Sequence, residues 1–306
     1  MDPQGTATGS VSISLNNDQD VTTPTITIGG SAVTPTTTVA GQDVRLSFAA
    51  TTGQRIVVYA TNVTNPAAVL YLVTPSGSNQ AYVGINNNPP GQTFFMDTQT
   101  LATTGTYQLW VQHSGTNIGS EMLQIGSVPP DFTGTLAVPL AGQTGAATRV
   151  PASGNLAVGQ NASLTFAGNN GQKLSFNLLN STIGNCIFYI DDPNTNQIAQ
   201  LSACAGYLDT ITLGTTGNYT AFINPAGTAT GTVSVSINND QDVTTPTISI
   251  GGGPVAAQTT VAAGRSVELR GDSGSTYRGI RNEREQPFGI PVFGDAERYE
   301  PSLRSD

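Results

Sequence analysis

Residues 5–30 of this chain read GTATGSVSISLNNDQDVTTPTITIGG, and residues 227–252 read GTATGTVSVSINNDQDVTTPTISIGG. The two stretches are identical at 22 of 26 positions, and the four differences exchange similar side chains. A weaker match at about half that distance relates TTGTY at 103–107 to TTGNY at 215–219. Self-similarity at a fixed spacing is the signature of repeated domains. The sequence therefore predicts a repeat unit of about 110 residues, which is the size of one β-sandwich domain.

Within each unit, apolar residues alternate with hydroxyl-bearing ones. Examples are VSISL at 11–15, VRLSF at 44–48, SLTF at 163–166 and VSVSI at 233–237. A period of two gives a β-strand one apolar and one polar face, and two sheets with such strands pack through their apolar faces. We therefore predict an all-β fold of tandem Ig-like or jelly-roll-like antiparallel β-sandwich repeats.

The repeat pattern predicts four segments along the chain. Residues 1–39 are the C-terminal half of a truncated repeat, 40–156 and 157–262 are β-sandwich repeats, and 263–306 start a further repeat and end in a charged, flexible tail. Residues 2–5 align with 224–227, inside a unit, so we expect the chain to be a piece of a longer array. On this interpretation residues 11–15 and 25–28 are exposed, unpaired strands.

Few charges are present. Only 10% of the residues are Asp, Glu, Lys or Arg, and the net charge is −9, whereas an ordinary soluble domain has about 25% charged residues. Without a basic stripe the chain does not suit nucleic acid or an anionic membrane surface. No apolar run approaches the ~18–20 residues that cross a bilayer. A surface rich in Thr, Ser and Asn is typical of secreted and cell-surface β-proteins, so we expect an extracellular or cell-surface location.

The chain contains two cysteines, Cys186 and Cys204. Their midpoint, residue 195, falls in the turn-forming stretch DDPNTN at 191–196. A hairpin centred there sets the cysteines opposite each other, so we predict a disulfide, which requires an oxidising compartment. The alternative is two buried free thiols that act as small apolar residues.

A family resemblance rests on turn and core residues. Its motifs are Gly41-Gln42, Leu46, Phe48, Gly53-Gln54, Thr74-Pro75-Ser76-Gly77, Leu101, Thr104-Gly105-Thr106-Tyr107 and Gly115 to Gly119. The pattern resembles tandem β-sandwich repeats of large bacterial surface and secreted proteins, including those before RHS/YD-repeat regions, and is similar to bacterial pre-peptidase C-terminal domains. It covers roughly residues 1–269 and implies an extracellular spacer, adhesion or targeting module without catalytic residues.

Acidic loop residues are candidate calcium ligands. NNDQD occurs at 16–20 and at 238–242, and the carboxylates of Asp18, Asp20, Asp240 and Asp242 are hard oxygen ligands of the kind that Ca²⁺ prefers. The middle unit keeps only the last aspartate, Asp131, and such residues also form turns without a metal. No other cofactor is expected.

Two aromatic residues are candidate sugar-stacking residues. Trp110 and its counterpart Phe222 lie on the strand face opposite the apolar residues, where a ring can stack on a sugar or pack under a neighbouring loop. His113 is the only histidine, and its counterpart is Pro225. We expect His113 to lie at a strand-to-turn junction. We expect no catalysis there, because a serine-hydrolase triad would depend on this histidine alone.

The sequence therefore favours a non-enzymatic bacterial module that acts as a spacer, display stalk or adhesion element. Its expected partners are other repeats of the same protein, neighbouring chains, and glycans or cell-surface proteins. One alternative is a filament subunit that assembles head to tail by strand complementation, and another is a carbohydrate-binding accessory domain.

Overall fold

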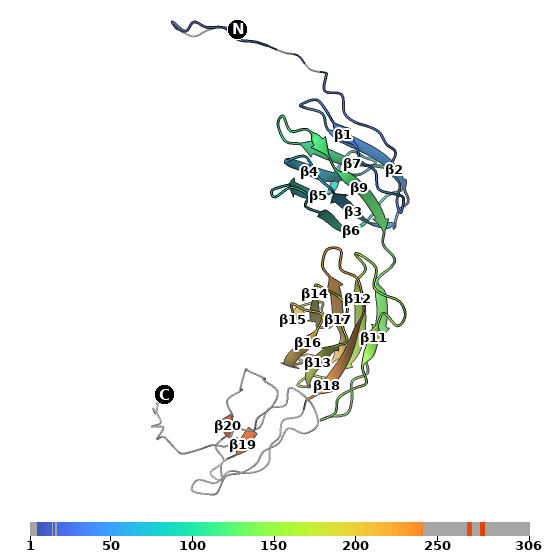
Figure 1. Cartoon of the computed structure of the whole chain (residues 1–306). Coiled ribbons are helices and arrows are strands. Elements are labelled where there is room, and N and C mark those ends of the chain that lie inside the picture. Colours follow the sequence, from blue (N-terminus) through green and yellow to red (C-terminus); the bar gives the residue numbers. More distant parts are fainter. Residues whose placement is uncertain (1–4, 14, 16, 241–267, 271–275, 279–306) are drawn as a thin grey trace. The chain divides into compact units, whose positions relative to one another are not determined.

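The computed structural model describes residues 5–13, 15, 17–240, 268–270 and 276–278 (Figure 1). None of these residues is helical, so this part of the chain offers no helix able to span a membrane. The described residues up to Asp240 belong to one compact unit, and the strands at 268–270 and 276–278 belong to another. The all-β prediction is confirmed.

The first β-sandwich consists of two antiparallel sheets. One sheet has the order β2-β7-β4-β5, with strands Val44–Ala50, Gly105–His113, Ala67–Val73 and Asn79–Asn86. The other has the order β6-β3-β9, with strands Phe94–Thr100, Arg55–Thr61 and Met122–Ser127. A short pair, β1 (Thr36–Thr37) and β8 (Gly119–Ser120), lies at one end.

The second β-sandwich has the same order in its corresponding strands. One sheet is β10-β12-β17-β14-β15, with strands Phe132–Thr135, Ala162–Gly168, Gly217–Pro225, Cys186–Asp191 and Gln197–Leu201. The other is β11-β18-β13-β16, with strands Thr148–Val150, Val233–Asn239, Lys173–Leu179 and Gly206–Thr212. Strands β2-β7-β4-β5 thus correspond to β12-β17-β14-β15, and β6-β3-β9 corresponds to β16-β13-β18.

The predicted alternation describes the cores well. Strands β2 and β12 have the same burial pattern, with every second side chain buried. The TTG-x-Tyr motif also has the same role in both sandwiches, because Tyr107 and Tyr219 are fully buried. Their hydroxyls donate hydrogen bonds to the carbonyls of Thr103 and Thr215 at 3.1 and 2.7 Å. Each motif thereby places a large ring in the core without leaving its hydroxyl unpaired.

The two cores divide elsewhere than the predicted boundaries at 40 and 157. Ile26 is buried in the first core, while Leu136 and Val150 are buried in the second. The reason is that the segment entering each sandwich visits both of its sheets. In the first sandwich, Val21 bridges in parallel to β2, and Val33 then bridges to β9 of the other sheet. In the second sandwich, β10 pairs in parallel with β12, and β11 then pairs with β18 of the other sheet. Residues 21–39 therefore belong to the first sandwich and 132–156 to the second.

The interpretation of residues 25–28 as an exposed, unpaired strand is wrong. Ile26 is 1% exposed, and Ile28 forms a parallel bridge with Ile125. Residues 11–13 and 15 are exposed as predicted, but they are not in a strand. A hairpin of β19 (Glu268–Arg270) and β20 (Thr276–Arg278) lies within 263–306, where we predicted the start of a further repeat and a flexible tail. The other residues of that range lie outside the described residues.

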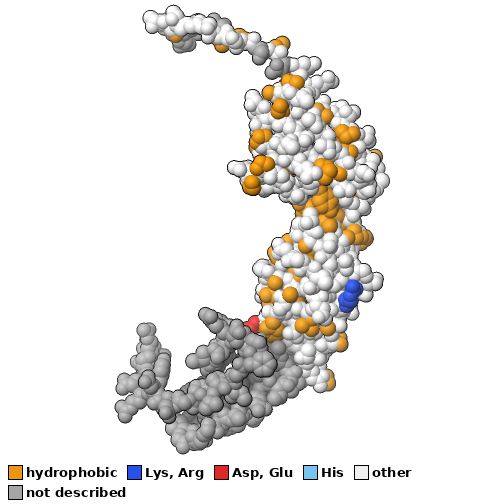
Figure 2. Space-filling model, viewed as in Figure 1, with side chains coloured by type: hydrophobic (Ala, Val, Ile, Leu, Met, Phe, Trp, Pro, Cys, Tyr) orange, Lys and Arg blue, Asp and Glu red, His pale blue; other side chains and the backbone are white. Residues whose placement is uncertain are grey.

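The described surface is poor in charge. Figure 2 shows mostly uncharged polar side chains and backbone, with scattered apolar side chains and few charged ones. Within the sandwiches, two Arg–carboxylate ion pairs occur, Arg45–Asp20 at 2.6 Å and Arg55–Asp131 at 2.7 Å. The described surface of the sandwiches therefore presents mainly hydroxyl, amide and backbone groups (Figure 2).

Candidate functional site

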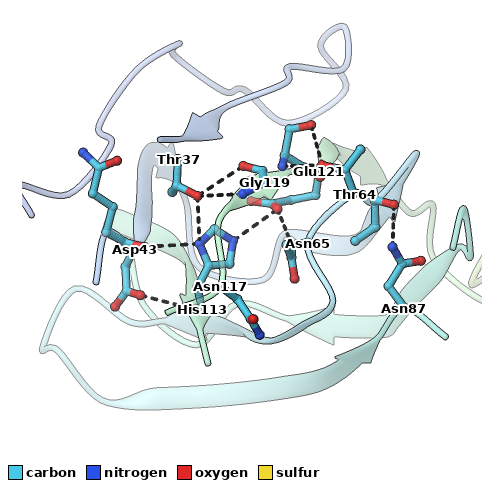
Figure 3. Close-up of polar contacts among 12 residues, drawn as sticks. Thr37, Asp43, Thr64, Asn65, Asn87, His113, Asn117, Gly119 and Glu121 are labelled. Atoms are coloured by element: carbon cyan, nitrogen blue, oxygen red, sulfur yellow. Dashed lines mark hydrogen bonds and ion pairs between the residues drawn. The ribbon is translucent and has the colours of Figure 1, made fainter. Parts of the chain in front are cut away.

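A buried polar cluster lies at one end of the first sandwich (Figure 3). Its centre is the imidazole of His113, at the end of β7, whose side chain is 1% exposed. Nε2 lies 3.4 Å from Oε2 of Glu121, a residue that is fully buried between β8 and β9. Nδ1 lies 3.2 Å from both the Thr37 hydroxyl and the Gln42 carbonyl. His113 is the last residue of β7, as expected for a strand-to-turn junction, and its side chain points into the interior.

The neighbours of His113 favour its charged form. The Gln42 carbonyl can only accept a hydrogen bond, and the Thr37 hydroxyl donates its own hydrogen to the Gly119 carbonyl at 3.2 Å. The Glu121 carboxylate accepts on the opposite side of the ring. Burial by itself lowers the pKa of His113, but Glu121, the Gln42 carbonyl and the charge of Asp43 together raise that pKa above its usual value.

Asn65 completes the cluster. It is fully buried, and its Nδ2 donates to Glu121 Oε2 at 2.8 Å. The other oxygens of this pair, Asn65 Oδ1 and Glu121 Oε1, are buried and have no hydrogen-bond partner among the described residues. Each of these two buried oxygens carries a desolvation cost that a hydrogen bond would otherwise offset.

The second sandwich replaces the whole cluster with apolar residues. The correspondence follows from shared pairings, because Thr64 and Thr182 donate in the same way to Ser120 and Thr232. At equivalent positions Thr37, Asn65, His113 and Glu121 become Leu156, Ile183, Pro225 and Val233, all of them buried. The same sandwich frame thus forms with a polar or an apolar interior at this end.

The cluster contains a hydroxyl, an imidazole and a carboxylate in the order of a catalytic triad, but it is sealed. Thr37 is 2% exposed, and its hydroxyl donates to the Gly119 carbonyl and accepts from the Gly119 amide at 3.0 Å. A nucleophile must reach its substrate. In this arrangement the hydroxyl is held by the backbone, so the cluster is suited to fastening the segment at 37–43 to β7.

The aromatic residue Trp110 belongs to a row that crosses the first sheet. Arg45, Trp110, Tyr71 and Tyr82 are direct cross-strand neighbours on β2, β7, β4 and β5. The Arg45 guanidinium lies 4.0 Å from the Trp110 ring centre on one side, and Tyr71 lies 5.2 Å away on the other. The indole thus contacts side chains of both neighbouring strands, and its Nε1 donates to Asp43 at 2.9 Å.

The equivalent row in the second sandwich is shorter. Phe222 stacks on Tyr189 with ring centres 4.9 Å apart, and the outer positions are Ser163 and Gln200. Cross-strand pairs of this kind stabilise sheets. Trp110 and Phe222 thus engage neighbouring side chains, and the most accessible ring of the first row is Tyr82, which is 72% exposed.

The candidate calcium ligands are dispersed. Asp20 accepts from the Arg45 Nε at 2.6 Å and the Asp43 amide at 3.2 Å, whereas Asp18 is exposed. Asp240 is buried at the end of the second sandwich and accepts from the Thr210 hydroxyl at 2.8 Å. Asp242 lies outside the described residues. No group of three potential ligands occurs in the part of the chain that the structure describes.

Asp20 and Asp131 instead share a structural role. Asp131 accepts from the Asn161 amide at 3.0 Å, as Asp20 does from Asp43. The preceding carbonyls accept in turn from the side chains of Gln160 and Gln42. Each sandwich thus begins with an aspartate that anchors the entering segment to the loop before its first long strand.

The predicted disulfide between Cys186 and Cys204 is present, with the Cα atoms 5.4 Å apart. Cys186 pairs in register with Pro225, the counterpart of His113. The corresponding end of the first sandwich therefore has a polar cluster where the second has apolar residues and a covalent link. Disulfides persist in oxidising environments, so the bond favours a location outside a reducing cytosol.

Comparison with known proteins gives fold-level likenesses only. No protein-family model matches the chain, and no curated protein matches it. The periplasmic g-type lysozyme inhibitor PliG of Aeromonas hydrophila is similar over 36% of this chain and 98% of its own, at 14% identity and a TM-score of 0.29. Salmonella Typhimurium PliG covers 35% and 97%, at 16% identity and 0.27. The PBSX exported protein XepA covers 67% and 86%, at 11% and 0.25. No functional conclusion follows from these values.

Proposed function

We propose that this chain is a non-catalytic structural module of an extracellular or cell-surface protein, serving as a spacer, display stalk or adhesion element. The support comes from what its two sandwiches have in common. They share the strand order, the buried tyrosine with its hydroxyl bonded to a carbonyl, and the anchoring aspartate. All three features build the frame.

One observation carries the proposal. The buried ionisable side chains of the first sandwich, His113 and Glu121, are replaced by Pro225 and Val233 in the second. The strand framework is the same in both sandwiches. A catalytic or binding function repeated along a chain would keep its reactive groups and vary the frame. In this chain the frame is kept and the reactive groups vary. This is expected where the folded domain itself, and not a reactive group, provides the function.

The location follows from independent features. The Cys186–Cys204 bond requires oxidising conditions to form. A surface with 10% charged residues, soluble through Thr, Ser and Asn, fits a secreted or cell-surface protein. The partners on this proposal are neighbouring repeats, other chains and the surface that the module contacts.

Glycan contact is a second candidate, and the observation that favours it is the exposure of Tyr82. Its ring lies at the end of the aromatic row on edge strand β5, with Tyr71 on one side at 6.1 Å. Because Trp110 is partly buried and contacts Arg45 and Tyr71, a sugar ring would stack on the more exposed Tyr82 instead. A glycan array with Tyr82→Ala as the negative variant and Trp110→Phe as the control tests this candidate.

Stretching single molecules between their two ends tests the structural role. A load-bearing module of independent sandwiches unfolds in two separate force peaks. A chain that extends without peaks, or in which both sandwiches give way together at the smallest measurable force, would remove the basis for a stalk or spacer.

A further inference from the structure

Two oxygen atoms in the polar cluster of the first sandwich can accept hydrogen bonds that no described residue donates (Figure 3). Asn65 and Glu121 are both 0% exposed, and Asn65 Nδ2 donates to Glu121 Oε2 at 2.8 Å. The other oxygen of each group, Asn65 Oδ1 or Glu121 Oε1, is buried and unpaired within the described part of the chain. Because the 2.8 Å bond joins the two groups that carry these oxygens, both oxygens belong to one small region of the interior.

The neighbouring donors of the cluster are directed at other acceptors. The Thr37 hydroxyl donates to the Gly119 carbonyl at 3.2 Å. His113 Nδ1 lies 3.2 Å from the Gln42 carbonyl, and its Nε2 lies 3.4 Å from Glu121 Oε2, the oxygen that already accepts from the amide. These side chains therefore do not supply a donor for Glu121 Oε1.

The chemistry of the two oxygens selects the kind of molecule that fits them. A carboxylate oxygen and an amide oxygen only accept hydrogen bonds, so the molecule must donate. It must also be small, because Thr37 is 2% exposed and the side chains of Asn65 and Glu121 are fully buried. Buried water in proteins typically makes about three hydrogen bonds to polar groups that have no other partner. Water meets both requirements.

A metal cation is the other class of ligand that such oxygens attract. The Glu121 carboxylate, however, already faces the imidazole of His113 at 3.4 Å, and the neighbours of that imidazole favour its charged form. A cation at Glu121 Oε1 would bury a second positive charge beside the same carboxylate, which is costly in the interior of a protein. Water adds no charge and is the better match.

The second sandwich supplies a comparison within the same chain. Ile183 and Val233 occupy the positions of Asn65 and Glu121, and they are 7% and 0% exposed. Apolar side chains offer a water molecule no hydrogen-bond partner, and cavities lined by such side chains stay dry. A bound water is therefore expected at this end of the first sandwich and not at the equivalent end of the second.

We propose that the first sandwich holds a water molecule in its interior, which donates hydrogen bonds to Glu121 Oε1 and Asn65 Oδ1. This water supplies the donors that the side chains lack, so that the buried groups of the cluster are hydrogen-bonded. The proposal concerns the interior of one sandwich only. It does not depend on the spacer or adhesion role proposed above, and the stretching experiment does not test it.

The first measurement locates the water without any variant. The full chain is labelled with nitrogen-15, and magnetisation transfer from water to the side-chain amide of Asn65 is recorded by NMR in the laboratory and rotating frames. The sign of the rotating-frame signal separates a bound water from hydrogen exchange. We expect a bound-water signal at Asn65 and none at the backbone amide of Ile183, its counterpart.

Two results of this measurement would overturn the proposal. One is the absence of a bound-water signal at Asn65. The other is a signal at both Asn65 and Ile183, because water would then enter this end of either sandwich whether or not polar groups are present.

A second measurement counts long-lived waters by the oxygen-17 relaxation dispersion of the solvent. The variant combines Thr37→Leu, Asn65→Ile, His113→Pro and Glu121→Val, which installs the apolar residues of the second sandwich. We expect this variant to lose one long-lived water per chain. An unchanged count contradicts the proposal, and the first measurement decides the matter if the variant does not fold.

Replacing sodium chloride by choline chloride distinguishes water from a metal cation. Choline is too large for the closed interior, so a sodium ion in this place would be lost without a substitute. We expect the bound-water signal and the chemical shifts of the Asn65 side-chain amide to stay the same. Shifts that change in choline and return with sodium would identify a cation in place of the water, and this result would overturn the proposal.

Discussion

The Nε2 atom of His113 lies 3.4 Å from Oε2 of Glu121 in the interior of the first sandwich. At the equivalent place in the second sandwich, Pro225 and Val233 are buried. The pair is therefore an addition to a frame that folds without it, and it gives the first sandwich a sensitivity to pH that the equivalent residues of the second cannot have.

Stability of the first sandwich should fall as the pH rises. Because the folded pKa of His113 is raised, the pair contributes fully below the pKa of an unfolded histidine, and this contribution is lost as the pH passes through the raised value. Urea unfolding at about pH 5.5 and about pH 9 measures the difference. Trp110, the only tryptophan, lies on β7 and reports on this sandwich alone.

The control for that prediction is Glu121→Gln, which keeps the shape but removes the charge. The His113 pKa should then fall, and most of the pH dependence should disappear. The pKa is followed directly by NMR, because the chain has a single histidine. An unchanged His113 pKa in this variant would show that Glu121 does not set it.

Removing one member of the cluster should cost more than removing all of it. Glu121→Ala leaves a buried imidazolium without its partner, which typically costs about 3–5 kcal/mol of unfolding free energy. The combined change of Thr37→Leu, Asn65→Ile, His113→Pro and Glu121→Val installs the residues of the second sandwich. It should be neutral or stabilising by about 1–4 kcal/mol. Trp110 fluorescence in urea measures both variants.

The second sandwich should depend on its disulfide. The bond joins residues 18 positions apart, and a loop of this length contributes about 3 kcal/mol. In calorimetry we expect two unfolding transitions, one for each sandwich. Cys186→Ala with Cys204→Ala should lower the midpoint temperature of the second sandwich's transition. The transition reported by Trp110 should stay in place, and a shift in both would mean that the sandwiches do not unfold independently.

Within the aromatic row, the residue in the middle should contribute more to the stability of the first sandwich than the residue at the end. The Tyr71 ring contacts the rings of Trp110 and Tyr82, whereas the Tyr82 ring contacts one described aromatic ring, that of Tyr71, and is 72% exposed. We expect Tyr71→Ala to cost about 2–3 kcal/mol and Tyr82→Ala about 0.5–1 kcal/mol. Equal costs in chemical denaturation would contradict a row that stabilises the sheet.

Much of the fold can be predicted from the sequence, because the alternation of apolar and polar residues indicates which side chains of a strand are buried. The core faces of β2 and β12, the tyrosine motifs and the disulfide follow from nearby residues. The entering segments do not, since Ile28 and Val33 join a sheet by single bridges and β11 has only three residues. The boundaries of the sandwiches were misplaced for this reason.

The polar cluster could not be recognised from spacing, because its members come together only through tertiary structure. Thr37 and His113 are 76 residues apart, and Asn65 and Glu121 are 56 apart. The available signal was the comparison of the two units, in which four polar positions of one are apolar in the other.

The most direct test of the structural role is to stretch single molecules with and without reductant. We predict two force peaks, each releasing about 110 residues, or about 380 Å of contour length at ~3.5 Å per residue. In oxidising buffer the peak of the second sandwich should be shorter by the 18-residue separation that the disulfide spans, about 60 Å, and reductant should restore this length. A single peak, no peak, or peak lengths that do not respond to reductant would contradict the account of two independent load-bearing sandwiches.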